Sequence, residues 1–404
     1  MSDTKMLAEI YNRQGVVKAK QGLHREALTD FSEAISIAPR LAAAFNNRGA
    51  SKLALGLRDE AIADFDEAIK IKPGSFDSYN NRGTAKSQLG NFKEAIADFD
   101  TAIELKPDYS AAYFNRGNVK ARLNKYREAI ADYDQSTRID QGYVEAYNAR
   151  GNAKSKLGLF ADAIDDYEKV IHNDPGRAEA HYSRGLAYAE LGRYKQAIQD
   201  YDAALRLKPD YAEAFSDRGI AKKGLGLHQE AIEDFNVSIR LKPQYAMAYN
   251  NRGTTYAALD QHQRAIADYD KAIRIDSSHA EVHYNRGQSE AALGKYDEAI
   301  SSWSKAIGIN SNDAIAYYNR GLARALSSQF DKAIADFLHA IELNPDYLEA
   351  YVHLGMVRKT IGKTQLAKEG LLRAQDLARK QGHIEALQFI AQALTDTDSN
   401  GTSP

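Results

Sequence analysis

Metal coordination is the first chemistry that the histidines and carboxylates of this chain could support. His279 and His283 stand four residues apart, a spacing at which two imidazoles on one helix face share a metal ion. They straddle an expected helix start and lack the glutamate of a metalloprotease motif, so we interpret them as packing residues. Asp132, Asp134 and Asp140 resemble part of a calcium loop, but a threonine occupies the place of its sharp-turn glycine. We therefore predict no catalytic residue, no metal site and no cofactor.

Ion pairing is the second chemistry, because arginine and aspartate recur with one common period. Nine arginines stand 34 residues apart: Arg48, Arg82, Arg116, Arg150, Arg184, Arg218, Arg252, Arg286 and Arg320. A row of aspartates follows with the same period: Asp64, Asp98, Asp132, Asp166, Asp200, Asp234, Asp268 and Asp336. A guanidinium can bind a carboxylate through two parallel hydrogen bonds, so we expect one pair in each period. Ser302 interrupts the aspartate row, and Arg286 must find another acceptor.

These rows belong to a repeating unit that is easiest to see in residues 76–109. Its period is 34 residues, and it is marked by Tyr79, Gly83, Leu89, Gly90, Ala95, Phe99, Ala102 and Pro107. In period and pattern the chain closely resembles the tetratricopeptide repeat (TPR) family. The resemblance implies an all-α, right-handed superhelical solenoid of antiparallel helix pairs. Eleven repeats follow without insertion or deletion, at 8–41, 42–75, 76–109, 110–143, 144–177, 178–211, 212–245, 246–279, 280–313, 314–347 and 348–381.

Each repeat is predicted to contain helix A over about the first fourteen positions and helix B from about position 18 to 31. Glycine at position 15 suits the left-handed residue that ends a helix; Asn124, Asp260 and Ser328 replace it in three repeats. Proline at position 32 ends helix B in most repeats. Glycine at position 8 occurs in all eleven, and since glycine weakens a helix by about 1 kcal/mol, we expect close contact between helices A and B to offset this cost.

The two ends of the chain depart from the repeat. Residues 1–7 form a polar lead-in, and we expect the first helix to begin near Ala8. Residues 382–394 carry apolar residues on one helical face, which predicts a capping helix of the kind that the open end of a solenoid needs. Residues 395–404 are rich in Asp, Ser, Thr and Gly and are predicted to be a disordered tail.

The arginine row occupies position 7, where the TPR pattern has leucine. A helical wheel places this position on the side of helix A that faces helix B, so the guanidinium groups should be partly buried. Buried charges need partners, and the aspartates at position 23 are the candidates, as in Arg82 with Asp98, Arg116 with Asp132 and Arg252 with Asp268. Lysine at position 11 could join these pairs. The alternative is that the arginines line a groove for acidic ligands.

Asparagine at position 6 is the better candidate for binding. The TPR resemblance implies that positions 2, 5, 6, 9, 12 and 13 face a concave groove, and that an asparagine at position 6 holds the backbone of an extended peptide. A side-chain amide offers a donor and an acceptor to a peptide unit. The row has two sections: Asn47, Asn81 and Asn115 (section 1), and Asn251, Asn285 and Asn319 (section 2). The alternative is a merely tolerated polar residue.

The neighbours of the two asparagine sections differ. In section 2, position 5 holds Asn250, Tyr284 and Tyr318, which suits apolar or aromatic side chains of a ligand. Position 2 is frequently acidic, unlike in TPR proteins that clamp acidic tails through lysine and arginine. We therefore expect neutral or basic segments as ligands rather than acidic ones.

Composition narrows the function further. Lys and Arg number 53 against 55 Asp and Glu, so a basic excess for binding nucleic acid is missing. The sequence contains no cysteine and no apolar run that could cross a bilayer, and a cytoplasmic location is the default expectation.

These observations favour a non-enzymatic scaffold or adaptor that binds extended segments of other proteins in its groove. Two alternatives stay open. One is a regulatory or substrate-recruiting subunit of an enzyme complex, and the other is a structural array that associates with itself. The sequence does not identify the partner.

Overall fold

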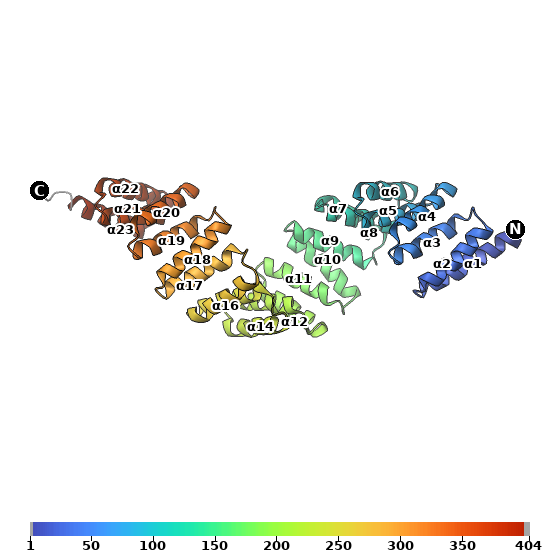
Figure 1. The fold of residues 1–404 in the computed structure, drawn as a ribbon, viewed down its shortest axis with the longest axis horizontal. Coiled ribbons are helices and arrows are strands. Elements are labelled where there is room, and N and C mark those ends of the chain that lie inside the picture. Colours follow the sequence, from blue (N-terminus) through green and yellow to red (C-terminus); the bar gives the residue numbers. More distant parts are fainter. Residues whose placement is uncertain (1–2, 400–404) are drawn as a thin grey trace. The chain divides into compact units, whose positions relative to one another are not determined.

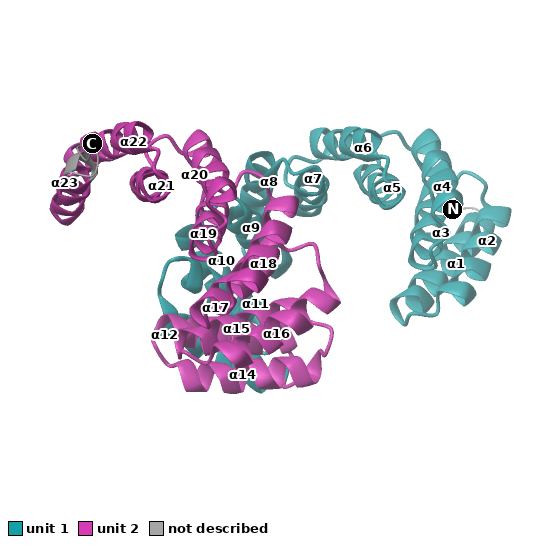
Figure 2. Ribbon diagram, turned by 60° about the vertical axis from the view of Figure 1, so that its left-hand side comes forward, with its two compact units in different colours: residues 1–208 teal, residues 209–404 magenta. Residues whose placement is uncertain are grey.

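The structure is a computed structural model that describes residues 3–399, and every regular element in this range is an α-helix. The chain divides into two compact units, residues 1–208 and 209–404, which Figure 2 distinguishes by colour. The division lies close to the end of repeat 6, so section 1 of the asparagine row belongs to the first unit and section 2 to the second. Each unit is described by itself below.

The first compact unit contains six helix pairs, which Figure 1 shows as successive antiparallel hairpins. Its helices are α1 (Asp3–Lys20), α2 (His24–Ile37), α3 (Ala42–Ala54), α4 (Arg58–Ile71), α5 (Phe76–Gln88), α6 (Phe92–Leu105), α7 (Ser110–Arg122), α8 (Tyr126–Ile139), α9 (Val144–Lys156), α10 (Phe160–Asn173), α11 (Ala178–Glu190) and α12 (Tyr194–Leu207).

The second compact unit contains five helix pairs and one further helix. Its helices are α13 (Ala212–Gly224), α14 (His228–Leu241), α15 (Ala246–Ala258), α16 (His262–Ile275), α17 (Ala280–Ala292), α18 (Tyr296–Ile309), α19 (Ala314–Leu326), α20 (Phe330–Leu343), α21 (Leu348–Thr360), α22 (Thr364–Gln381) and α23 (Ile384–Ser399). In both units each helix packs against its neighbours in the chain, as expected for a solenoid.

Helix ends within the repeats follow the sequence pattern. In a typical inner repeat, helix A covers positions 1–13 and helix B positions 17–30, each limit within about a residue of the prediction. The residue at position 15 has a positive φ in all eleven repeats, including Asn124 (59°), Asp260 (57°) and Ser328 (59°). The left-handed residue that ends helix A is therefore confirmed, also where glycine is replaced.

The ends of the chain are more helical than predicted. Helix α1 begins at Asp3 rather than near Ala8, because residues 3–7 contain no glycine or proline and Asp3 places a negative charge at the positive end of the helix dipole. Helix α23 continues to Ser399 rather than ending at Leu394, so residues 395–399 of the predicted disordered tail are helical. The remaining tail residues, 400–404, lie outside the described part of the chain.

Glycine at position 8 allows an aromatic ring to sit directly on helix A. A Cβ added to Gly117 would lie 2.7 Å from the Tyr133 ring, and one added to Gly49 would lie 2.7 Å from the Phe65 ring. Such distances are below van der Waals contact, so only glycine leaves room for the ring at position 24. This contact confirms the close approach of helices A and B and accounts for the otherwise unfavourable glycine.

The hydrophobic core is a seam of small clusters rather than one interior. A representative cluster joins Ala61 and Phe65 of α4 to Ala85 of α5, all fully buried. At the C-terminal end Ile390 of α23 is fully buried against residues of α21 and α22, such as Leu371. Helix α23 thus covers the last repeat, as the predicted capping helix should.

Candidate functional site

Each arginine of the position 7 row, except Arg286, binds the aspartate at position 23 of its own repeat. In repeat 4, Arg116 on α7 donates from Nε to Asp132 Oδ2 (3.0 Å) and from Nη2 to Asp132 Oδ1 (2.6 Å). The Asp132 side chain on α8 is only 5% exposed and that of Arg116 is 18% exposed. The same two-point geometry joins Arg48 to Asp64, Arg82 to Asp98, Arg184 to Asp200, Arg218 to Asp234, Arg252 to Asp268 and Arg320 to Asp336.

Lysine at position 11 joins the pair from the next turn of helix A. Lys120 Nζ lies 2.7 Å from Asp132 Oδ2, and Lys86 Nζ lies 2.8 Å from Asp98 Oδ2. In these repeats the buried carboxylate therefore faces two cations, an arginine and a lysine. Lys52, Lys154 and Lys222 occupy the same place in their repeats.

The third nitrogen of the guanidinium reaches back to the preceding repeat. Arg116 Nη1 donates to Asp100 Oδ1 (2.6 Å), which lies at position 25 of repeat 3. The corresponding contacts pair Arg82 with Asp66, Arg150 with Asp134, Arg184 with Glu168 and Arg252 with Asn236. We did not foresee this link between repeats, although the acidic residues recurring at position 25 were a visible signal for it.

Aromatic residues at position 4 cover the same guanidinium groups. The Cζ atom of Arg116 lies 5.5 Å from the centre of the Tyr113 ring, and Arg82 lies 5.3 Å from that of Tyr79. These rings therefore pack over the arginines in cation–π geometry. Burial would lower the pKa of Arg116, but its hydrogen bonds and the charges of Asp132 and Asp100 raise the pKa overall. With all sides engaged, the geometry favours a structural ladder over a ligand groove.

In repeat 9 the arginine at position 7 pairs with carboxylates at other positions. Arg286 lies 2.9 Å from Asp270 Oδ1 of the preceding repeat and 3.2 Å from Glu290 Oε1 on its own helix. Glu290 stands at position 11, where six other repeats have lysine, and Ser302 donates to it (2.6 Å). Burial raises the pKa of Glu290. The carboxylate has therefore moved from helix B to helix A in this repeat.

A test follows from this exchange. Ser302→Asp should destabilise the protein by about 2 kcal/mol, because a second carboxylate would lie beside the buried Glu290. Adding Glu290→Lys should restore stability, since the pair would then reproduce the arrangement of repeat 4. Urea unfolding of both variants checks this, and an unchanged stability of the single variant would argue against a buried ladder in repeat 9.

Asparagines at position 6 donate a hydrogen bond to the side chain at position 5 of the preceding repeat. Asn115 Nδ2 donates to Asn80 Oδ1 (2.9 Å), Asn81 Nδ2 to Asn46 Oδ1 (3.1 Å) and Asn47 Nδ2 to Asn12 Oδ1 (3.0 Å). In section 2, Asn285 donates to Asn250 Oδ1 (3.2 Å) and Asn319 to Tyr284 Oη (2.9 Å). All six asparagines lie in the described part of the chain, and among them Asn251 does not make such a bond.

These bonds leave part of each amide unengaged. Only one N–H group of the amide is used, and within the described residues no side chain or backbone group donates to the Oδ1 atoms of Asn81, Asn115, Asn285 or Asn319. The six side chains are half-buried, so their outer edges remain accessible. The row is a set of oriented amides whose carbonyl oxygens can each accept a hydrogen bond from a ligand.

The position 5 residues of section 2 differ in exposure. Asn250 is only 1% exposed, so our expectation that it contacts a ligand was wrong; its place is beneath the row, as the acceptor for Asn285. Tyr284 and Tyr318 are half-buried. Burial raises the pKa of Tyr318 to about 12, its hydroxyl lies 3.2 Å from His353 Nδ1, and its ring packs on Tyr347.

Sequence profiles of known families match most of the repeat region. Profiles described as tetratricopeptide repeat match residues 12–76, 76–109, 148–212, 246–279 and 314–347, and one described as TPR repeat matches 117–158 and 287–327. The chain belongs to the tetratricopeptide repeat family. No curated protein sequence matches this TPR chain.

Solved TPR structures resemble the chain over varying lengths. A tetratricopeptide repeat protein from Parabacteroides merdae is 24% identical, with a TM-score of 0.51, over 62% of this chain and 98% of that one. YrrB, a TPR protein with an unusual peptide-binding site, is 27% identical (TM-score 0.40, covering 46% and 95%). Yeast Tom70 is 14% identical (TM-score 0.45, covering 97% and 96%). The first of these supports the TPR fold.

Two equivalent hollows open beside the asparagine row of this TPR protein. One, of about 390 Å³, lies next to Asn319 between repeats 9 and 10, and the other, of about 260 Å³, lies next to Asn47 between repeats 1 and 2. A third, of about 510 Å³, lies between α21 and α23 and is lined by apolar residues that include Val352, Met356 and Phe389.

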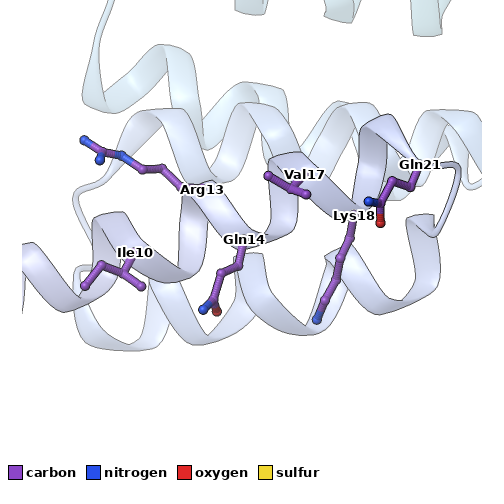
Figure 3. Close-up of a pocket in the computed structure, with 6 residues that line it drawn as sticks. All are labelled: Ile10, Arg13, Gln14, Val17, Lys18 and Gln21. Atoms are coloured by element: carbon purple, nitrogen blue, oxygen red, sulfur yellow. The ribbon is translucent and has the colours of Figure 1, made fainter.

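A further hollow lies on the face of α1 that carries Ile10, Arg13, Gln14, Val17, Lys18 and Gln21 (Figure 3). Ile10 and Val17 occupy positions 3 and 10, which most inner TPR repeats bury against the preceding helix B; here they are 45% and 55% exposed. This hollow therefore lies at the end of the repeat stack in the first compact unit and is not part of the groove.

The two histidines that stand four residues apart in the sequence do not form a shared site. His283 is buried and its ring lies 3.3 Å from the Ser277 carbonyl, while His279 pairs with Asp276, so the two histidines face different partners. No group of three or more histidine, aspartate or glutamate side chains that could hold a metal occurs among the described residues. Within the same range, no helix is long and apolar enough to cross a membrane.

Proposed function

We propose that this TPR protein is a non-enzymatic scaffold or adaptor that binds extended segments of other proteins along its asparagine row. The observation that carries the proposal is the bond between position 6 and position 5 of the preceding repeat. It fixes every amide of the row except that of Asn251 before a ligand arrives, so that less conformational entropy is lost on binding. The free Oδ1 atoms then accept backbone N–H groups without requiring a particular ligand sequence.

The proposal includes the character of the ligand. Glu281 and Glu349 stand at position 2 near section 2, and the arginines that could attract an acidic segment are held by the ladder. We therefore propose neutral or basic segments as ligands and no role in binding nucleic acid, whose phosphates would need free cations. Its cytoplasmic location stays a prediction from the sequence.

Affinity capture tests the proposal with a variant of section 2. The substitutions Asn251→Ala, Asn285→Ala and Asn319→Ala should lower the recovery of section 2 ligands at least tenfold, because the backbone acceptors are lost. Peptides from the recovered proteins should bind the wild-type chain and bind the variant at least tenfold more weakly.

Two controls separate binding from folding. Tyr284→Phe removes the acceptor that fixes Asn319 but keeps every asparagine, so it should fold normally and weaken binding less than the triple asparagine variant. The equivalent section 1 variant, Asn47→Ala with Asn81→Ala and Asn115→Ala, identifies ligands of the other section. Recovery of the same proteins by the wild type and both asparagine variants would contradict the proposal.

A further inference from the structure

The hollow between repeats 9 and 10 has an apolar floor and walls. Trp303 of α18, only 3% exposed, forms the floor. Ala291 of α17 and Leu322 and Leu326 of α19 form the walls, and Leu326 is 63% exposed. None of the residues that line the hollow carries a formal charge. An exposed leucine beside a hollow with a buried tryptophan floor is apolar surface that a ligand can cover.

Tryptophan at position 24 leaves this floor without a hydroxyl group, as phenylalanine does in other repeats. In repeats 4 and 5 a tyrosine occupies the position, and its hydroxyl donates to the asparagine at position 9: Tyr133 to Asn118 and Tyr167 to Asn152, each at 2.8 Å. Trp303 has no hydroxyl at this place, and its indole N–H group is buried without a hydrogen-bond partner among the described residues. The position 9 residue of repeat 9, Gln288, donates instead to Tyr284 Oη (3.1 Å).

The equivalent hollow between repeats 1 and 2 provides a natural comparison. It is smaller, about 260 Å³ against about 390 Å³, and it is lined by Lys20 and His24 as well as apolar groups. Ala50 stands where repeat 10 has Leu322. The two hollows thus share their place beside the asparagine row and differ in size and polarity.

We propose that the hollow between repeats 9 and 10 is a specificity pocket for one bulky apolar side chain, leucine, methionine or phenylalanine, of a neutral extended peptide. This inference rests on the proposed function. Asn319 lines the pocket and supplies a backbone acceptor at its edge, so a peptide held by section 2 would present a side chain to the Trp303 floor. Section 1, with the smaller and more polar hollow, lacks this selectivity.

Selection from a displayed library of random 12-residue peptides tests the pocket. The full-length wild-type chain should enrich peptides that share one bulky apolar residue at a fixed place. Replacing that residue by alanine in an enriched peptide should weaken binding at least tenfold. Ala291→Trp, which fills the pocket, should weaken binding of the parent peptide as much, whereas the matched Ala19→Trp in the equivalent hollow should leave it unchanged.

Other outcomes overturn the pocket in distinguishable ways. Enriched peptides that lose binding in the Asn251, Asn285 and Asn319 variant, but share no apolar residue or are unaffected by Ala291→Trp, would overturn the pocket and leave peptide capture intact. Failure to enrich any peptide that depends on the asparagines would overturn both. If Ala291→Trp fails to fold, Leu322→Ala serves instead: it should reduce the preference for the apolar residue, and an unchanged preference would overturn the pocket.

Discussion

Replacing Asp132 by alanine is expected to destabilise repeat 4 by about 3 to 5 kcal/mol, the usual consequence of leaving buried charges without their partner. Asp132 is the common acceptor of Arg116 and Lys120, whose side chains are only 18% and 16% exposed. Without it both cations would remain between α7 and α8. Arg116→Leu should cost less, because Lys120 would continue to neutralise the carboxylate.

Asp100→Ala is the matched control for this substitution. Asp100 also binds Arg116, but its side chain is 46% exposed, so its loss should cost less than about 1 kcal/mol. Urea unfolding measures the stability, and hydrogen exchange shows whether the loss is confined to α7 and α8, as expected where repeats contact only their neighbours. Equal, small effects of both substitutions would indicate a solvated row.

Gly117→Val is expected to destabilise the protein by about 2 to 3 kcal/mol, although valine is a better helix former than glycine. The added Cβ would lie 2.7 Å from the Tyr133 ring. That ring cannot easily give way, since it is 1% exposed and its hydroxyl is bonded to Asn118. Either α7 or α8 must therefore move.

Gly308→Val isolates the steric effect. Gly308 also lies in a helix, α18, but no atom would lie within 4 Å of its added Cβ. Its substitution should change the stability by less than about 0.5 kcal/mol. Thermal unfolding of the two variants measures the difference, and a similar response from both would mean that the glycine at position 8 is not kept for packing.

Features that lie within one repeat could be predicted from the sequence. The pairing of Arg116 with Asp132 follows from a period shared by two opposite charges, and the left-handed Asn124 follows from its alignment with glycines. The reason is that eleven copies reveal which residue types a position accepts, and the helical period then gives the face on which they lie.

Features that join successive repeats could not be predicted in this way. The bond from Asn285 to Asn250 depends on how one helix A lies against the next, which neither the helical period nor the residue types determine. For this reason Asn250 looked like a ligand-binding residue and is buried instead. The pocket over Trp303 was not predicted, because it depends on residues of repeats 9 and 10 that differ from the common repeat pattern.

The measurement that tests the central claim most directly is the affinity of a section 2 ligand peptide with and without methylated backbone nitrogens. N-methylation removes the donors that the asparagine Oδ1 atoms would accept and leaves every side chain of the peptide unchanged. We predict that it lowers the affinity for the wild-type chain at least tenfold. It should have little further effect on the variant without Asn251, Asn285 and Asn319. Equal affinity of the methylated and unmethylated peptides for the wild-type chain would contradict backbone recognition by the asparagine row.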